Sequence, residues 1–220
     1  MHITLTDRLT CPRCGPGVGL IVLMDEVADR RVMRGSLGCP VCRTRYPIAG
    51  RVADLRVGGG AGGGAEGGNG RARARAEAED AQAMRVAALL GLNEGTGFVV
   101  VDGPHALTVG AALRGVAPDY EPVVVVAEDE AAAAGAAPVS ALLADAALPM
   151  ADSLMRGAAY IGDAPSRERL AELVRVVRPT GRVVLDGADA AQLDDAVRTL
   201  EALGAQVRAR DAGGLLAVVM

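Results

Sequence analysis

The sequence predicts an α/β protein in which a small metal-bound β ribbon precedes a larger, mostly parallel sheet. Three observations lead to this prediction. All four cysteines lie in two copies of C-P-x-C within the first 42 residues. Beyond residue 95, short apolar runs alternate with amphipathic runs that have the period of a helix. The last two apolar runs, residues 206–210 and 215–220, are too close for a helical crossover and predict an antiparallel hairpin.

Composition excludes several classes of protein. Of the 220 residues, 50% are apolar but only 2% are aromatic, so a sizeable core must consist of Ala, Val and Leu. The net charge of −4 argues against a broad basic face for nucleic acid. The chain contains no Lys, which excludes a Schiff-base lysine and a phosphate-loop lysine. No apolar run reaches about 18 residues, so we expect no membrane span.

The cysteines and the N-terminus predict a cytoplasmic protein. The first residues, MHITLTDR, lack the charged lead and apolar core of a secretory signal. Cysteines in CxxC pairs without such a signal indicate a reducing compartment and metal binding rather than disulfides.

The chain divides into three predicted segments. Residues 1–57 contain every cysteine and are expected to form a zinc ribbon. Residues 58–70, GGGAGGGAEGGNG, have almost no side chains to pack and are expected to be a flexible linker spanning roughly 20 Å. Residues 71–220 begin with a helix-like run and form the larger domain.

The four cysteines are the candidate metal ligands. Two CxxC turns separated by 24 residues offer four thiolates in a tetrahedron, which suits structural Zn²⁺ because no position stays open for a substrate. The segment between the turns alternates well enough for two strands. A segment this small buries little core, so the metal should contribute to its folding free energy. The ligands are Cys11, Cys14, Cys39 and Cys42.

The larger domain is predicted to contain seven strands with helices between most of them, which indicates a parallel sheet covered on both faces. The strands are expected at residues 98–102, 123–127, 140–143, 157–162, 182–186, 206–210 and 215–220.

Two helices carry clear boundary signals. Ser166 can cap the first, and Pro179 is expected to end it. Asp189 and Gln192 form a capping box for the second, which Gly204 ends. The apolar faces consist of Leu170, Leu173, Val174 and Val177 in the first helix, and Leu193, Val197 and Leu200 in the second.

The cysteine-containing segment resembles a known family over about residues 6–55. LTCPRC, GLIVLM and GSLGCPVCRTRYPIAG are similar to the small zinc-ribbon activator subunit of tRNA- and protein-modifying methyltransferases. Tyr46, Pro47 and Ile48 are the most specific part of the match. The resemblance implies a ribbon that does no chemistry itself. Such a ribbon lends an apolar strand edge to a methyltransferase and stabilises it.

Residues 95–220 resemble class I S-adenosylmethionine-dependent methyltransferases. The matching segments are ALLADAALPMADSLMRGAAYIGD and LAELVRVVRPTGRVVL. The resemblance implies a Rossmann-like, methyltransferase-type sheet with S-adenosylmethionine over the carboxyl ends of the first strands. It implies six cofactor-binding residues: Asp102 and Gly103 in the first turn, Glu128 and Asp129 as the candidate ribose acids, and Asp145 and Ala146 at the adenine.

The first turn departs from the family pattern. The family has D-x-G-x-G-x-G there, whereas this chain has VVVDGPHALTVG, with Pro104 and His105 in place of small residues. No base-methylating motif is present, so the sequence assigns no catalytic residue, and His105 and Asp163 are only weak candidates.

Three functions follow from these observations. The first is a scaffold or partner-binding protein whose methyltransferase-like domain has lost catalysis. The second is an active methyltransferase that carries its activator in cis, and the sequence does not decide whether the protein is an enzyme. The third is an RNA-associated zinc-ribbon protein, which Arg71, Arg73 and Arg75 would serve but which the acidic net charge disfavours.

The expected partners follow from the same resemblances. We expect the ribbon to dock within the chain on the larger domain, helped by the high effective concentration that fusion gives. In the alternative, its edge recruits a separate methyltransferase or another part of the translation and tRNA-modification machinery.

Overall fold

The computed structural model describes residues 1–58 and 72–220, and the side chains of residues 72–78 are not described. Apart from Gly58, the predicted linker therefore lies outside the described residues. The same is true of Arg71 and of the side chains of Arg73 and Arg75. No helix in the described part of the chain is long and apolar enough to cross a membrane.

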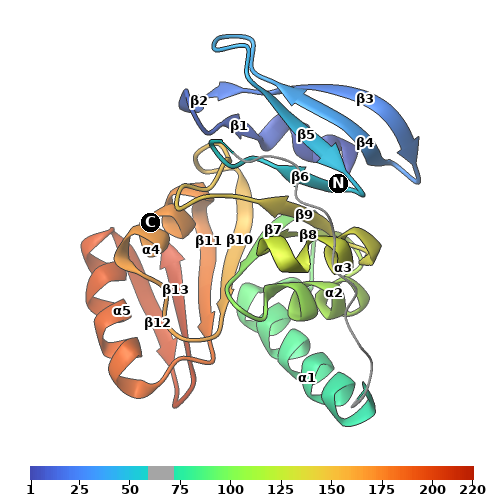
Figure 1. Ribbon diagram of the computed structural model, residues 1–220. Helices are drawn as coiled ribbons and strands as arrows, with labels where there is room; N and C mark the ends of the chain where they lie inside the picture. The colour runs from blue at the N-terminus through green and yellow to red at the C-terminus, as the bar shows by residue number, and fades with distance from the viewer. Residues whose placement is uncertain (59–71) are drawn as a thin grey trace.

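The N-terminal segment is a ribbon of short antiparallel strands (Figure 1). Strand β3 pairs with β4, β4 with β5 and β5 with β6, while β1 pairs separately with β2. The elements are the 3-10 helix η1 (Ile3–Arg8), β1 (Thr10–Cys11), β2 (Gly15–Gly19), β3 (Ile21–Ala28), β4 (Arg31–Gly38), β5 (Arg45–Ala49) and β6 (Val52–Asp54).

The rest of the chain alternates strands and helices as predicted. Its elements are α1 (Ala72–Leu90), β7 (Gly97–Asp102), α2 (Ala106–Val116), β8 (Tyr120–Val125), η2 (Glu128–Glu130), α3 (Ala131–Ala136), β9 (Ser140–Leu143), β10 (Met155–Ile161), α4 (Arg167–Val176), β11 (Val177–Asp186), α5 (Ala190–Ala202), β12 (Ala205–Arg210) and β13 (Gly214–Val219).

These strands confirm the predicted fold class. Strands β11, β10, β7, β8 and β9 are parallel neighbours, and β12 and β13 form the antiparallel hairpin beside β11. Strand order reverses between β7 and β10, because the chain runs outward to β8 and β9 and then returns to β10. Ligands of such sheets bind beside this reversal, at the carboxyl ends of the strands.

Helices cover both faces of this sheet, and alternate strand residues point to each. Val99 and Val101 of β7 share a core with α1 and α2, whereas Val100 belongs to the core under α4 and α5. Because all three valines are fully buried, β7 is a central strand with two apolar faces.

The predicted helix boundaries are confirmed with one correction. The Ser166 hydroxyl accepts a hydrogen bond from Arg169 N, and Asp189 and Gln192 form the capping box. Gly204 takes a positive φ of 81° just beyond α5. Helix α4, however, ends at Val176 and not at Pro179, so Val177, predicted on the apolar helix face, instead begins β11. The residue before a proline disfavours helical angles, so the chain becomes extended earlier.

The ribbon continues the large sheet directly. Strand β6 lies parallel to β9, with Val52 opposite Ala141, and the chain beyond β6 extends the pairing through a 2.9 Å hydrogen bond from Leu55 N to Leu143 O. The result is one sheet of eleven strands in the order β12-β13-β11-β10-β7-β8-β9-β6-β5-β4-β3. The apolar core under α4 and α5 also includes the ribbon side chains Leu37 and Tyr46.

A buried ion pair joins the ribbon to β8. Arg31 Nη1 and Nη2 lie 2.7 and 2.9 Å from the two carboxylate oxygens of Glu121. The two side chains are only 12% and 8% exposed, and the Ser140 hydroxyl donates a further 2.8 Å hydrogen bond to Glu121 Oε1. Such a pair fixes the orientation of the ribbon relative to β8, because any other orientation would leave a buried charge without its partner, at a cost in folding free energy.

We predict that replacing Arg31 alone destabilises the whole chain. Arg31→Met removes the cation that pairs with the buried Glu121 carboxylate, which should lower the free energy of unfolding by about 3–5 kcal/mol. Urea denaturation measures this change. The double variant Arg31→Met/Glu121→Gln should recover much of the loss, because it leaves no buried charge. An Arg31→Met chain as stable as the parent would contradict the prediction.

Candidate functional site

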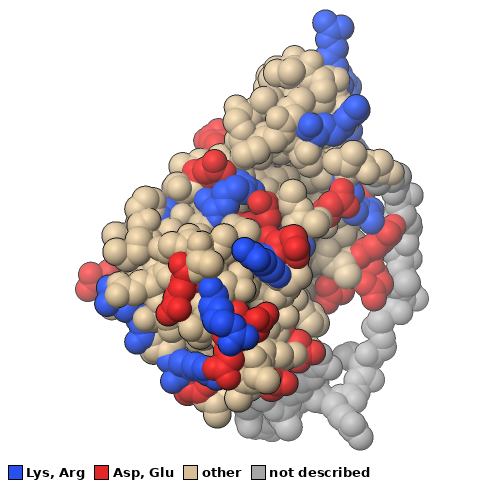
Figure 2. All heavy atoms as spheres, turned by 90° about the vertical axis from the view of Figure 1, so that its left-hand side faces the viewer, with Lys and Arg blue, Asp and Glu red and all other residues tan. Residues whose placement is uncertain are grey.

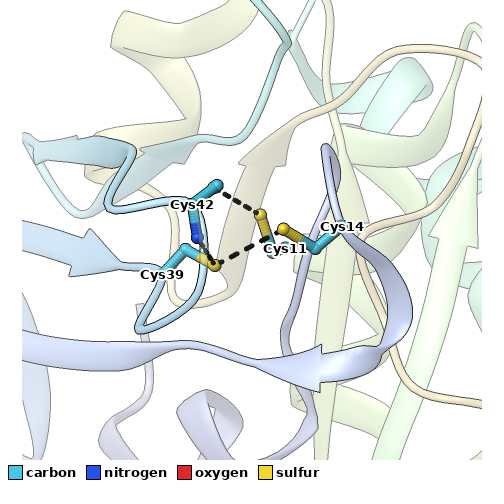
Figure 3. Close-up of side chains that lie close together, drawn as sticks. All are labelled: Cys11, Cys14, Cys39 and Cys42. Carbon is cyan, nitrogen blue, oxygen red and sulfur yellow. Dashed lines mark hydrogen bonds between the residues drawn. The ribbon is translucent and has the colours of Figure 1, made fainter.

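The four cysteines come from two turns that face each other across the ribbon (Figure 3). Cys11 ends β1 and Cys14 follows in the turn before β2. Cys39 directly follows β4, and Cys42 lies in the turn before β5. Both turns thus lie where antiparallel strands begin or end, which is how residues about 30 positions apart come together.

Their sulfur atoms have the spacing of a metal site. Cys11 Sγ lies 3.6 Å from Cys42 Sγ, and Cys14 Sγ lies 3.8 Å from Cys39 Sγ. All four lie within 4.8 Å of one another, and the thiols are free. Four sulfurs placed about 2.3 Å from a central Zn²⁺ would form a tetrahedron with edges of about 3.8 Å. The residues therefore fit a four-coordinate ion with thiolate ligands.

Nearby polar groups hold the sulfurs in place. Tyr46 Oη lies 3.4 Å from Cys11 Sγ, and Thr44 Oγ1 lies 3.3 Å from Cys42 Sγ. Burial and the Cys11 hydrogen bond raise the pKa of Tyr46, so its hydroxyl keeps the proton that it can donate. Hydrogen bonds from Thr44 lower the pKa of Cys42 to about 6. Desolvation and the other thiols raise the pKa of Cys14 to about 12.

The predicted cofactor residues follow the ends of β7, β8 and β9. Asp102, which ends β7, is 5% exposed, and its Oδ1 accepts a 2.8 Å hydrogen bond from Gly103 N. Gly103 has a φ of 101°, and a Cβ there would lie 2.5 Å from Ile161 O, so only glycine fits this turn. Burial raises the pKa of Asp102, against the charge of Arg169.

Arg169 of α4 crosses this edge of the sheet. Its Nε lies 3.1 Å from Asp102 Oδ2, and its Nη2 donates a 3.3 Å hydrogen bond to Asp145 O. The guanidinium thus joins the end of β7 to the loop after β9. The Ser166 cap at the start of α4 sets the position of Arg169, because the cap fixes the first helical turn.

The chain that leaves the ribbon meets the other two strand ends. Arg56 pairs with Asp54 and places its Nη1 2.8 Å from Glu128 Oε2. Val57 N donates a 2.8 Å hydrogen bond to Asp145 Oδ2. Asp129 and Ala146 are exposed beside them. The structure therefore brings the ribbon's end to the same edge as the predicted cofactor residues.

These contacts occupy groups that the resemblance assigns to S-adenosylmethionine. The candidate ribose acid Glu128 is paired with Arg56, and Arg169 bridges the turn beside Asp102. Pro104 packs directly against Gly162, where a Cβ would lie 2.9 Å from the Pro104 Cδ. The sequence analysis missed Arg56 and Arg169, whose roles depend on strand neighbours that no local motif reveals.

Comparisons with known proteins assign no family. No family model and no curated protein matches the chain. The antibiotic-resistance methyltransferase Kmr is similar in structure, with 20% identity, a TM-score of 0.45, and coverage of 63% of this chain and 92% of that one. A chain from the complex of the Haloferax volcanii Trm112 methyltransferase activator with a methyltransferase has 14% identity, a TM-score of 0.48, and coverage of 67% and 95%.

A third solved structure is geranyl diphosphate methyltransferase in complex with GPP and sinefungin. It has 12% identity and a TM-score of 0.49, and the match covers 64% of this chain and 77% of that one.

We predict that the four thiols bind one metal ion and that Tyr46 strengthens the binding. Tyr46→Phe removes the hydroxyl beside Cys11 without emptying the core, so metal affinity should fall about 10- to 100-fold. Competition with a chromogenic chelator measures the change. Tyr160→Phe, in β10 and away from the thiols, is the matched control. Unchanged affinity in Tyr46→Phe, or elemental analysis that finds no metal in folded protein, would contradict this prediction.

Proposed function

We propose that the protein is a non-catalytic scaffold in which a zinc ribbon completes a methyltransferase-like sheet. The observation that carries the proposal is that the chain's own groups engage the three strand ends where a cofactor would bind. Arg169 contacts Asp102, Arg56 contacts Glu128, and Val57 contacts Asp145.

The strength of the Arg169 contact supports the loss of cofactor binding. Asp102 is almost fully buried, with 7% of its side chain exposed, and Arg169 is 19% exposed. Removing one partner of a buried pair costs about 3–5 kcal/mol. A cofactor bound at 100 μM gains about 5.5 kcal/mol in all. A cofactor that displaces Arg169 must therefore supply its own partner for the buried Asp102 carboxylate before binding is favourable. The Arg56–Glu128 pair adds less, because Glu128 is 56% exposed.

In this proposal the ion is structural Zn²⁺. Four thiolates close its coordination shell, so it supplies folding free energy to the ribbon and no site for a substrate. The ribbon in turn covers the edge of β9 with β6, which is the role of an activator subunit carried within the same chain.

A second candidate is an active methyltransferase with its activator in cis. One observation favours it: although Arg169 Nε lies 3.1 Å from Asp102 Oδ2, neither Asp102 Oδ2 nor Arg169 Nη1 forms a hydrogen bond with the described part of the chain, as groups that await a ligand would not. His105 and Asp163 are its candidate catalytic residues; the first precedes α2, and the second is exposed in the loop after β10.

Calorimetric titration with S-adenosylmethionine separates the two candidates. We expect no binding tighter than about 100 μM by the metal-loaded full chain. Binding tighter than this, if it is lost in Glu128→Ala or Asp129→Ala, would overturn the non-catalytic proposal. It would also locate the cofactor beside these two residues. Glu201→Ala, which removes an exposed carboxylate on α5, is the control for non-specific loss.

Removal of the metal tests the structural role of the ribbon. Because ribbon and sheet share one apolar core, we expect chelation to lower the melting temperature of the whole chain by about 5–10 °C, as a loss of about 2–3 kcal/mol would. Added Zn²⁺ should restore it. A melting temperature that chelation leaves unchanged would contradict a stabilising ribbon.

A further inference from the structure

Exposed apolar side chains gather on the ribbon. Ten large apolar residues are exposed in the described part of the chain, and half of them belong to the ribbon's β3 and its second cysteine turn. In Figure 2 the uppermost surface, formed by the ribbon, is mostly tan and blue. By strand alternation Ile21 and Leu23 share one face of β3, and Met24 lies on the other. Neighbouring exposed apolar residues such as Ile21 and Leu23 indicate an interaction surface, whereas single ones are ordinary. The five are Ile21, Leu23, Met24, Val27 and Val41.

Three neighbouring strands shape part of this surface into a groove. In the sheet, Ile21 of β3 lies opposite Gly38 of β4, and Gly38 lies opposite Arg45 of β5. Ile21 and Leu23 therefore form one wall, Arg45 forms the other, and Gly38 leaves the floor low. A Cβ on Gly38 would meet nothing closer than Ile21 O at 3.8 Å, so the groove floor has free space.

The groove is basic at one end. Arg43 and Arg45 line it and are exposed, and neither forms an ion pair with a carboxylate among the described residues. Val41, 66% exposed, extends the apolar surface beyond the cysteine turn. A ligand that complements this groove carries a large apolar group and negative charge.

Two further observations select the class of ligand. Asp25 and Glu26 lie in the outermost strand, and the β3–β4 register shifts beside them, so a second copy pairing edge to edge would meet like charges on an irregular strand. The groove contains no aromatic side chain on which a base could stack, since Tyr46 is 2% exposed on the opposite, buried side. A protein segment fits better than a second copy or RNA.

We propose that this groove binds an extended segment of a partner protein, with a large apolar side chain over Gly38 and acidic side chains against Arg43 and Arg45. The inference rests on the proposed scaffold function and names the surface and the partner chemistry for it. The segment crosses the face of the ribbon, so β3 need not accept it as an added strand.

A selection from a random 12-residue peptide display library tests the inference on the metal-loaded full chain. We expect enriched peptides to combine a large apolar residue with Asp or Glu. Fluorescence anisotropy with a labelled enriched peptide should then show at least tenfold weaker binding to Gly38→Leu, which fills the groove, and to Arg45→Glu. Val116→Ser, an exposed apolar residue on α2, is the matched control and should bind as the parent does.

The variants need a folding check, which metal content and melting temperature provide. If Gly38→Leu disturbs the neighbouring Cys39, Ile21→Ser tests the same wall from β3. Peptides that are basic, or that bind Gly38→Leu, Ile21→Ser and Arg45→Glu as well as the parent, would overturn the inference, and so would a selection that enriches none. Labelled tRNA that binds at physiological salt and is lost in Arg43→Glu would assign the surface to RNA instead.

These outcomes are independent of the cofactor titration. Tight S-adenosylmethionine binding would overturn the non-catalytic proposal and leave the peptide result standing. Failure of the peptide selection would reject the binding role of the groove. It would not affect the proposal that the protein does not bind a cofactor.

Discussion

The parallel pairing of β6 with β9 is the interaction on which the other features depend. It turns the ribbon from an appended segment into the outer strands of the main sheet, and the Arg31–Glu121 pair fixes its orientation from within the shared core. A β-sheet edge offers unpaired backbone groups, so covering it with another strand satisfies them and hides apolar surface together. The orientation that results sends the chain beyond β6 toward the carboxyl ends of β8 and β9.

This arrangement links the four-cysteine cluster to the strand ends of the larger sheet. The thiols hold the two turns of the ribbon together, the turns hold β4 and β5, and these strands position β6. Arg56 and Val57 follow β6 directly and make the contacts to Glu128 and Asp145. Opening the four-cysteine cluster is therefore expected to weaken both the sheet edge and the contacts that cover the strand ends, because packed strands connect them.

Local patterns predicted what local physics controls. The strand from residue 140 to 143 and the Asp189–Gln192 capping box were predicted correctly, because alternation and capping depend on neighbouring residues. The two cysteine turns lie 25 to 31 positions apart, and the repeated CxxC motif predicted their approach because one tetrahedral ion needs all four thiols. The Arg31–Glu121 and Arg56–Glu128 pairs join residues 90 and 72 positions apart, and no period in the sequence encodes such contacts. Both ion pairs depend on the pairing of β6 with β9, which brings the ribbon against the larger sheet.

The buried carboxylate of Asp102 explains the form of the sheet edge where the sequence predicts a cofactor. A carboxylate at the end of a central strand loses its water and needs a donor or a cation, as its raised pKa indicates. Gly103 N donates a hydrogen bond to Asp102 Oδ1. Asp102 Oδ2 lies near Arg169, which is in the first turn of α4 that Ser166 caps. A ligand that displaces this guanidinium has to provide a cation or hydrogen-bond donors for the Asp102 carboxylate. Access to the edge is therefore set by where α4 begins as much as by the missing glycines of the first turn.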